Sequence, residues 1–135
     1  MAAIWSADAP VTVILDALFR LDGKTALVVG AGGGVGEAAA ALIGQVGARL
    51  ITADAPAAPR RASTAAAASL AVDVCDEASV TGLLADIAAR FGDIDILVYA
   101  ATLPAGFAFE TMSLADWRKV QEVNLQGAFL CLREA

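Results

Sequence analysis

Hydrophobic residues in this chain fall into short continuous runs that alternate with segments of helical periodicity. The runs predict strands at Thr25–Val29 and at residues 49–53, 69–72 and 94–100. Helical spacing predicts helices from about Gly34 to Val46, at Glu77–Phe91 and from Leu114 onward. Because strands joined by helices return to one sheet in parallel, this order predicts an α/β fold with a doubly wound parallel sheet. The chain would carry the first four strands of that sheet and their helices.

Two segments lie outside this alternation. Residues 1–21 carry a helical stripe of apolar side chains and predict a helical extension, so that the domain proper covers residues 22–135. Residues 55–69 are rich in alanine, and Pro56 and Pro59 predict a surface loop there, although residues 65–68 could form a short helix. Farther along, Ser113 together with Asp116 predicts the amino-terminal cap of the last helix.

Composition predicts a core of small aliphatic side chains and argues against several partners. The chain is 59% hydrophobic but only 6% aromatic, which is typical of a buried parallel sheet covered by helices. Its formal net charge of −6 argues against binding to nucleic acid or to an anionic membrane surface. The apolar stretch of residues 11–19 is interrupted by Asp16 and has no basic residue before it, so neither a secretion signal nor a membrane span is predicted.

The cysteine and histidine content narrows the chemistry. Cys75 and Cys131 are the only cysteines and form no C-x-x-C motif, so we expect free buried thiols in a cytoplasmic protein. Histidine is absent, which excludes histidine-dependent nucleophilic triads, histidine metal centres and dehydrogenases with a histidine acid or base. No metal site is predicted, and cofactors that carry hydride are the leading candidate ligands.

A glycine-rich turn between the first strand and the first helix is the strongest chemical signal. Residues 28–37 read VVGAGGGVGE, a variant G-x-x-x-G-x-G of the dinucleotide-binding pattern. Glycine lets the chain turn sharply at 30, and at 34 and 36 it lets a diphosphate or a packed strand approach the backbone. The helix that follows directs unpaired N–H groups at such an anion. Candidate cofactor-binding residues are therefore Gly30, Gly33, Gly34, Val35 and Gly36, with a purely structural turn as the alternative.

An acidic residue, Asp54, follows the second strand. A carboxylate at this place can accept hydrogen bonds from both hydroxyl groups of an adenosine ribose and repels a 2′-phosphate, which favours NAD over NADP. Two alternatives stay open, because Asp54 could simply cap the loop and Arg60 or Arg61 could still reach a phosphate.

Five motifs in order resemble the amino-terminal half of the short-chain dehydrogenase/reductase family. They are the glycine turn, the strand end at Asp54, Asp73-Val74, the run DILV at residues 95–98, and the run VNLQGAF at residues 123–129. The resemblance covers residues 21–135 and implies a Rossmann-like dinucleotide-binding domain that is incomplete at its carboxyl end.

The same resemblance implies roles for individual residues. Asp73 would accept a hydrogen bond from the adenine amino group, Val74 would pack on the adenine ring, and the main chain of Ala100 and Ala101 would contact the cofactor. Asn124 would be the one catalytic candidate, because its main chain would hold a water of the proton relay. Taken alone, Asp73 could be a turn residue and Asn124 a polar residue at a helix irregularity.

The chain also departs from the family pattern. Val29 stands where the family has threonine, and residues 99–102 read YAAT where the family has N-N-A-G. These exchanges predict apolar packing in place of the hydrogen bonds that would brace the strand ends. The family's serine and Y-x-x-x-K pair would lie beyond Ala135, and Tyr99, the only tyrosine, has Leu103 where that pattern needs lysine. We therefore expect the chain to be truncated within its last helix and inactive by itself.

The sequence thus predicts an oxidoreductase that transfers hydride between NAD, or less favourably NADP, and a small carbonyl or alcohol substrate, with this chain as the cofactor-binding half. The apolar segment 102–109 favours a hydrophobic or acyl-type substrate. A homo-oligomer, or a complementary chain that supplies missing strands, would cover the open edge of the fourth strand. The alternative is a non-catalytic nucleotide-binding or structural subunit that needs a partner chain, while a FAD or nucleotide-sugar protein is disfavoured by the glycine spacing.

Overall fold

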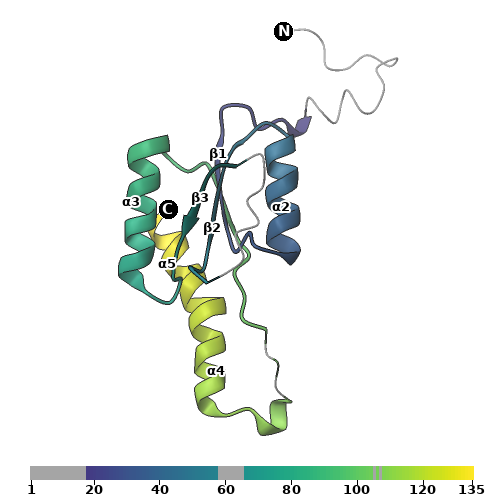
Figure 1. Cartoon of the computed structure of the whole chain (residues 1–135), viewed down its shortest axis with the longest axis vertical. Coiled ribbons are helices and arrows are strands. Elements are labelled where there is room, and N and C mark those ends of the chain that lie inside the picture. The colour runs from purple at the N-terminus through teal and green to yellow at the C-terminus, as the bar shows by residue number, and fades with distance from the viewer. Residues whose placement is uncertain (1–17, 58–65, 105, 107) are drawn as a thin grey trace, which may run out of the picture.

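The chain folds into a four-stranded parallel sheet with helices on both faces (Figure 1). The computed structural model describes residues 18–57, 66–104, 106 and 108–135. The strands lie in the order β3-β2-β1-β4 and comprise β1 (Thr25–Val29), β2 (Arg49–Asp54), β3 (Ala66–Ala71) and β4 (Ile96–Tyr99). All three pairs of neighbours are parallel. The predicted α/β, Rossmann-like partial fold is therefore confirmed.

Alternating side chains of the sheet build one core on each face. Helix α2 (Gly34–Gln45) covers one face, where Val28 and Leu50 are buried with Ala40. On the other face, Leu27 and Ile51 belong to a larger core with Val80, Leu83, Leu84 and Ile87 of α3 (Glu77–Phe91) and with Leu130 and Cys131 of α5 (Gly127–Glu134). Figure 1 shows α2 on one side of the sheet and α3 with α5 on the other. This two-sided burial explains why the strands are uniformly apolar.

The third strand differs from its prediction. It covers Ala66–Ala71, so it begins before the expected residue 69, and the short helix considered for residues 65–68 is wrong over its described part. The reason is pairing with β2, which holds Ala68 beside Ile51 and Ser69 beside Thr52. Alanine carries little preference of its own, so the neighbouring strand decides its conformation. The first strand has its predicted boundaries, whereas at β2, β4 and α2 the predicted boundaries differ from the observed ones by one or two residues.

The predicted last helix is three consecutive helical segments. After a 3-10 turn η1 (Phe109–Thr111), α4 (Leu114–Gln121) continues into a π-helical turn η2 (Glu122–Gln126) and then into α5. The predicted cap is confirmed, because the hydroxyl of Ser113 accepts the Asp116 N–H at 3.1 Å. In Figure 1, α4 extends beyond the sheet while α5 packs against it.

The proposed extension at residues 1–21 lies almost entirely outside the described residues, as does most of the alanine- and proline-containing loop. In the part of the chain that the structure describes, every helix is too short or too polar to cross a bilayer. Both cysteines carry free thiols as predicted, but only Cys131 is buried, whereas Cys75 is half-buried.

Candidate functional site

The turn between β1 and α2 requires glycine for two different reasons. Gly30 has a φ of +85°, and a Cβ at this position would overlap the main chain of Ala100 and Ala101. A Cβ at Gly36 would overlap the carbonyl of Gly30, so it is the turn itself that packs closely here. Gly34 has a φ of +56°, and no other group lies within 4 Å of the place that a Cβ would take there. The close approach expected at both 34 and 36 is therefore found within the protein only at 36, and the backbone at 34 faces open space.

Asp54 connects the end of β2 to this turn. Its Oδ2 accepts the N–H of Gly32 at 2.5 Å, and its Oδ1 accepts the N–H of Ala55 at 2.9 Å. Gly30 is held from the same strand end, because its N–H donates to the carbonyl of Ala53 at 2.8 Å. The carboxylate thus fixes the glycine-rich turn to the carboxyl end of the sheet, which is the loop-holding role considered as the alternative for this residue.

Asp73 lies two residues after β3 and shapes the next connection. Its Oδ1 accepts the N–H of Cys75 at 3.0 Å, while its own N–H donates to the hydroxyl of Ser79 at 3.0 Å. Asp73 therefore makes a tight turn that leads into α3, as its residue type alone suggests. Burial, followed by the negative charge of Asp73, raises the pKa of the Cys75 thiol, so this thiol stays protonated near neutral pH.

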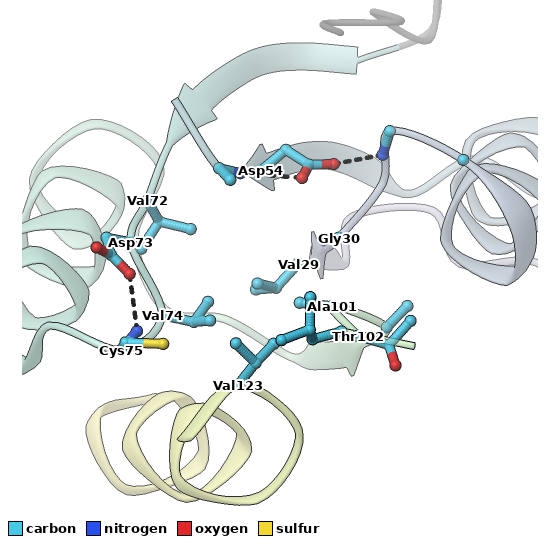
Figure 2. A pocket seen from close by; sticks show the side chains of 15 residues that line it. Val29, Gly30, Asp54, Val72, Asp73, Val74, Cys75, Ala101, Thr102 and Val123 are labelled. Carbon is cyan, nitrogen blue, oxygen red and sulfur yellow. Dashed lines mark hydrogen bonds between the residues drawn. The ribbon is translucent and has the colours of Figure 1, made fainter. Parts of the chain in front are cut away.

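A cavity of about 390 Å³ opens at the carboxyl ends of the four strands (Figure 2). Figure 2 shows Val29 and Gly30 at its centre, with Asp54 on one side and Val123 on the other. Among the candidate residues, those that line it are Gly30, Gly33, Asp54, Asp73, Val74, Ala100 and Ala101. The remaining lining residues are Val29, Gly32, Ala55, Val72, Cys75, Thr102, Leu103 and Val123. The structure thus brings together the ends of all four strands around a largely apolar space with two carboxylates at its edge.

Four candidate residues lie outside the cavity lining: Gly34, Val35, Gly36 and Asn124. The first three form the start of α2, where Val35 is exposed and Gly36 is buried. Asn124 is in η2, so the helix irregularity considered for it is present. Its side chain brackets Leu103, accepting the Leu103 N–H at Oδ1 over 2.8 Å and donating from Nδ2 to the Leu103 carbonyl over 3.3 Å.

Tyr99 departs from the expectation of purely apolar packing. Its hydroxyl donates to the main-chain carbonyl of Val123 at 2.5 Å, which ties the end of β4 to the π-helical turn. Burial, with smaller contributions from Cys131 and Cys75, raises the pKa of Tyr99 to about 12. The tyrosine at this strand end therefore keeps a hydrogen bond to a neighbouring segment, because its hydroxyl donates to the main chain of η2.

None of the eight remaining lining residues was named from the sequence as a cofactor-binding candidate, and Val72, Cys75 and Val123 are three of them. Val72 and Cys75 flank the Asp73-Val74 pair, so the strand end itself was an available signal for both. Val123 begins the run VNLQGAF that carries the family resemblance, so that motif was an available signal, although the position of Val123 beside the cavity depends on how η2 packs.

Comparison with known proteins identifies several relatives. A family model described as short chain dehydrogenase matches residues 24–135. D-threitol dehydrogenase of Mycolicibacterium smegmatis is 42% identical over 119 residues, which are 83% of this chain and 46% of that protein. Sorbitol dehydrogenase of Cereibacter sphaeroides is 44% identical over 118 residues, with 84% and 46% covered.

The fold has a counterpart among solved structures. The crystal structure of a dehydrogenase/reductase from Sinorhizobium meliloti superposes with a TM-score of 0.80 at 26% identity, over 89% of this chain and 51% of that chain. The chain therefore spans about half the length of the relatives that it matches.

Proposed function

Because the chain belongs to the short-chain dehydrogenase family, we propose that its cavity binds NAD and that the whole protein transfers hydride between NAD and a small alcohol or carbonyl compound. The observation that carries the proposal is the cavity of about 390 Å³ that joins the glycine-rich turn, Asp54 and Asp73 at the carboxyl ends of the strands. In open α/β sheets, ligands bind at that edge of the sheet.

The residues present fit a dinucleotide. At Gly33 and Gly34 no other group lies within 4 Å of where a side chain would start, so a diphosphate has access to the backbone and to the start of α2. Val72, Val74 and Val123 offer apolar contacts to a flat ring, and Asp73 offers a carboxylate beside them. We assign Ala100 and Ala101 to main-chain contacts with the same ligand, since both line the cavity beneath the glycine turn.

Asp54 supports NAD as the preferred nucleotide. One of its oxygens accepts the Gly32 N–H and the other accepts the Ala55 N–H, but each carboxylate oxygen can accept a further hydrogen bond. A ribose with free hydroxyl groups can donate those bonds, whereas a 2′-phosphate would bring a second negative charge beside the first.

The chemistry follows from the family. The bound nicotinamide would supply the hydride acceptor or donor. This chain would bind and orient the dinucleotide, and the main chain of Asn124 would hold a water for proton transfer. Tyr99 is not a proton donor to substrate, since its hydroxyl donates to Val123 and its pKa is raised to about 12. We therefore propose that residues 1–135 supply cofactor binding and that groups outside them complete the reaction.

The names of the relatives suggest a substrate class. D-threitol and sorbitol are polyols, and a third relative is named meso-2,3-butanediol dehydrogenase. We propose small polyols and diols as the first compounds to screen, ahead of the hydrophobic carbonyl compounds that the apolar segment 102–109 suggests.

A non-catalytic nucleotide-binding subunit is the second candidate. Two observations favour it: Val29 replaces the family's threonine, and the Tyr99 hydroxyl is engaged by a main-chain carbonyl. Both candidates use the same cavity, so binding of NAD supports either, and turnover of a polyol by the intact gene product would separate them.

We also propose a partner for the surface that runs along α4, η2 and α5. Trp117, Leu125 and Phe129 line a groove of about 600 Å³ there and are exposed. An exposed apolar groove of this kind fits a second copy of the protein.

The decisive experiment measures the dissociation constants of NAD and NADP by calorimetry for the wild-type protein and for Asp54→Asn. We expect NAD to bind more tightly than NADP, and the substitution to weaken NAD by about tenfold while it removes the discrimination, because a charge-assisted hydrogen bond contributes about 1.5–3 kcal/mol. Asp93→Asn makes the same chemical change at an exposed residue before β4, at the other end of the strand, and should leave both constants unchanged. Failure of the wild-type protein to bind either nucleotide would refute the proposal.

A further inference from the structure

Tyr99, the last residue of β4, contacts the helical segment across two of its elements. Its hydroxyl donates to the carbonyl of Val123 in η2 at 2.5 Å. The same hydroxyl occupies the space where a Cβ on Gly127, the first residue of α5, would have to lie. The close packing of ring and helix therefore depends on a tyrosine at one position and a glycine at the other.

The π-helical register explains why the Val123 carbonyl is available to a side chain. In an α-helix the N–H of Gly127 would donate to the carbonyl four residues earlier, which is that of Val123. Here it donates to Glu122 instead, as a π-helical turn requires. The Val123 carbonyl therefore does not accept the Gly127 N–H that it would accept in an α-helix. The Tyr99 hydroxyl donates to this carbonyl instead.

The turn held in this way carries part of the cavity wall. Val123 lines the cavity directly. The adjacent Asn124 brackets both main-chain groups of Leu103, which also lines the cavity. A displacement of the π-helical turn would therefore move two lining residues, one in η2 and one in the connection that follows β4.

We propose that Tyr99 is a positioning residue. By holding the π-helical turn at Val123, it fixes the bracket between Asn124 and Leu103 and thereby sets the affinity of the cavity for its ligand. Tyr99 is not among the residues that line the cavity, so it acts through the turn rather than by contact. The proposal rests on the proposed function for the identity of the ligand. The hydrogen bonds between Asn124 and Leu103 can be measured without any ligand.

The first test follows the bracket by hydrogen exchange in the intact gene product without nucleotide. Tyr99→Phe removes only the hydroxyl, and we expect the Leu103 amide, which donates to Asn124, to exchange about fivefold faster, the factor that corresponds to one lost hydrogen bond. The matched control is Thr52→Val, which removes a hydroxyl that lies 2.9 Å from Ser69 Oγ within the sheet. This variant should leave the Leu103 exchange rate unchanged. Equal rates in wild type and Tyr99→Phe would overturn the proposal.

The second test measures the dissociation constant of NAD for the same variants. Tyr99→Phe should raise it about fivefold, and this increase should vanish in an Asn124→Ala background, because no bracket is then left to position. An unchanged constant, or an equal increase in both backgrounds, would contradict a role through Asn124. If the wild-type protein does not bind NAD, the proposed function fails, and the Leu103 exchange rate still decides this inference.

Discussion

Among single residues, Gly30 illustrates how backbone conformation limits the choice of side chain. We predict that Gly30→Ala destabilises the protein by about 3 kcal/mol or more, because alanine would adopt a positive φ and its Cβ would overlap main-chain atoms that cannot turn away. Gly23→Ala is the matched control, since Gly23 has a similar φ of +79° with no neighbour within 4 Å. It should cost only about 1–2 kcal/mol. Urea unfolding followed by circular dichroism measures both, and equal costs would show that packing against Ala101 is unimportant.

Tyr99 gives a prediction for alkaline pH. Its pKa is raised from 10.0 to about 12 in the folded protein, chiefly by burial. Above pH 10 the unfolded chain releases the phenol proton of Tyr99, while the folded protein retains it. The contribution of the Tyr99 hydroxyl to the free energy of unfolding is therefore complete below pH 10 and is lost as the pH rises to 12. We expect the difference in unfolding free energy between wild type and Tyr99→Phe to shrink over that interval.

The comparison with Tyr99→Phe also removes the destabilisation that burial of the two thiols causes in both proteins at alkaline pH. Burial raises the pKa of both Cys75 and Cys131, so their own titration lowers stability in both proteins, while their charges add to the raised pKa of Tyr99 only in wild type. Denaturant unfolding at several values between pH 8 and pH 12 measures the difference. A difference that stays constant over this range would contradict the raised pKa of Tyr99.

Between elements, the contact of β4 with α5 leaves no room for a side chain at Gly127. We predict that Gly127→Ala costs about 1–3 kcal/mol, because its Cβ would overlap the Tyr99 hydroxyl and lie 3.0 Å from the Cβ of Val74. In the Tyr99→Phe background the cost should be smaller by at least about 0.5 kcal/mol, since one of the two obstacles is gone. Additive effects of the two substitutions would contradict this packing.

Gly82→Ala provides the control for helix propensity. Gly82 lies inside α3 with no other group within 4 Å of an added Cβ. The change to alanine should therefore stabilise the protein by up to about 1 kcal/mol. Thermal unfolding is measured for Gly127→Ala, Tyr99→Phe, Gly82→Ala and the double variant Tyr99→Phe/Gly127→Ala. The comparison separates the gain in helix propensity from the loss of packing.

Elements differ in how far the sequence determines them. Thr25–Val29 could be predicted because a strand buried on both faces is apolar throughout. The start of β3 could not, since its alanines become a strand only through pairing with Leu50 and Ile51 of β2. For the π-helical turn, Asn124 suggested only that the helix is irregular, because the type of irregularity is visible only in the hydrogen bonds of Glu122–Gln126.

For the molecule as a whole, parallel topology explains which site residues were predictable. Gly30, Asp54 and Asp73 lie at or just after the ends of three different strands. The carboxyl ends of parallel strands meet at one edge, so the convergence of these residues on one cavity follows from strand order. Leu103 and Val123 reach the same cavity through the bracket of Asn124 and the brace of Tyr99. Such contacts depend on how a helix packs, which periodicity does not specify.

The last prediction concerns association. If the groove along α4, η2 and α5 binds a second copy, Leu125→Lys should shift the protein toward the monomer, because a charged group would have to be buried at the contact. Leu42→Lys on α2 is the matched control, since the exposed fractions of Leu42 and Leu125 are 62% and 66%. Analytical ultracentrifugation measures the mass, and neither variant should alter NAD affinity, because neither residue lines the cavity that we propose for NAD. Dissociation by both variants would indicate a general effect of added charge, whereas dissociation by Leu42→Lys alone would place the contact on the opposite face of the sheet.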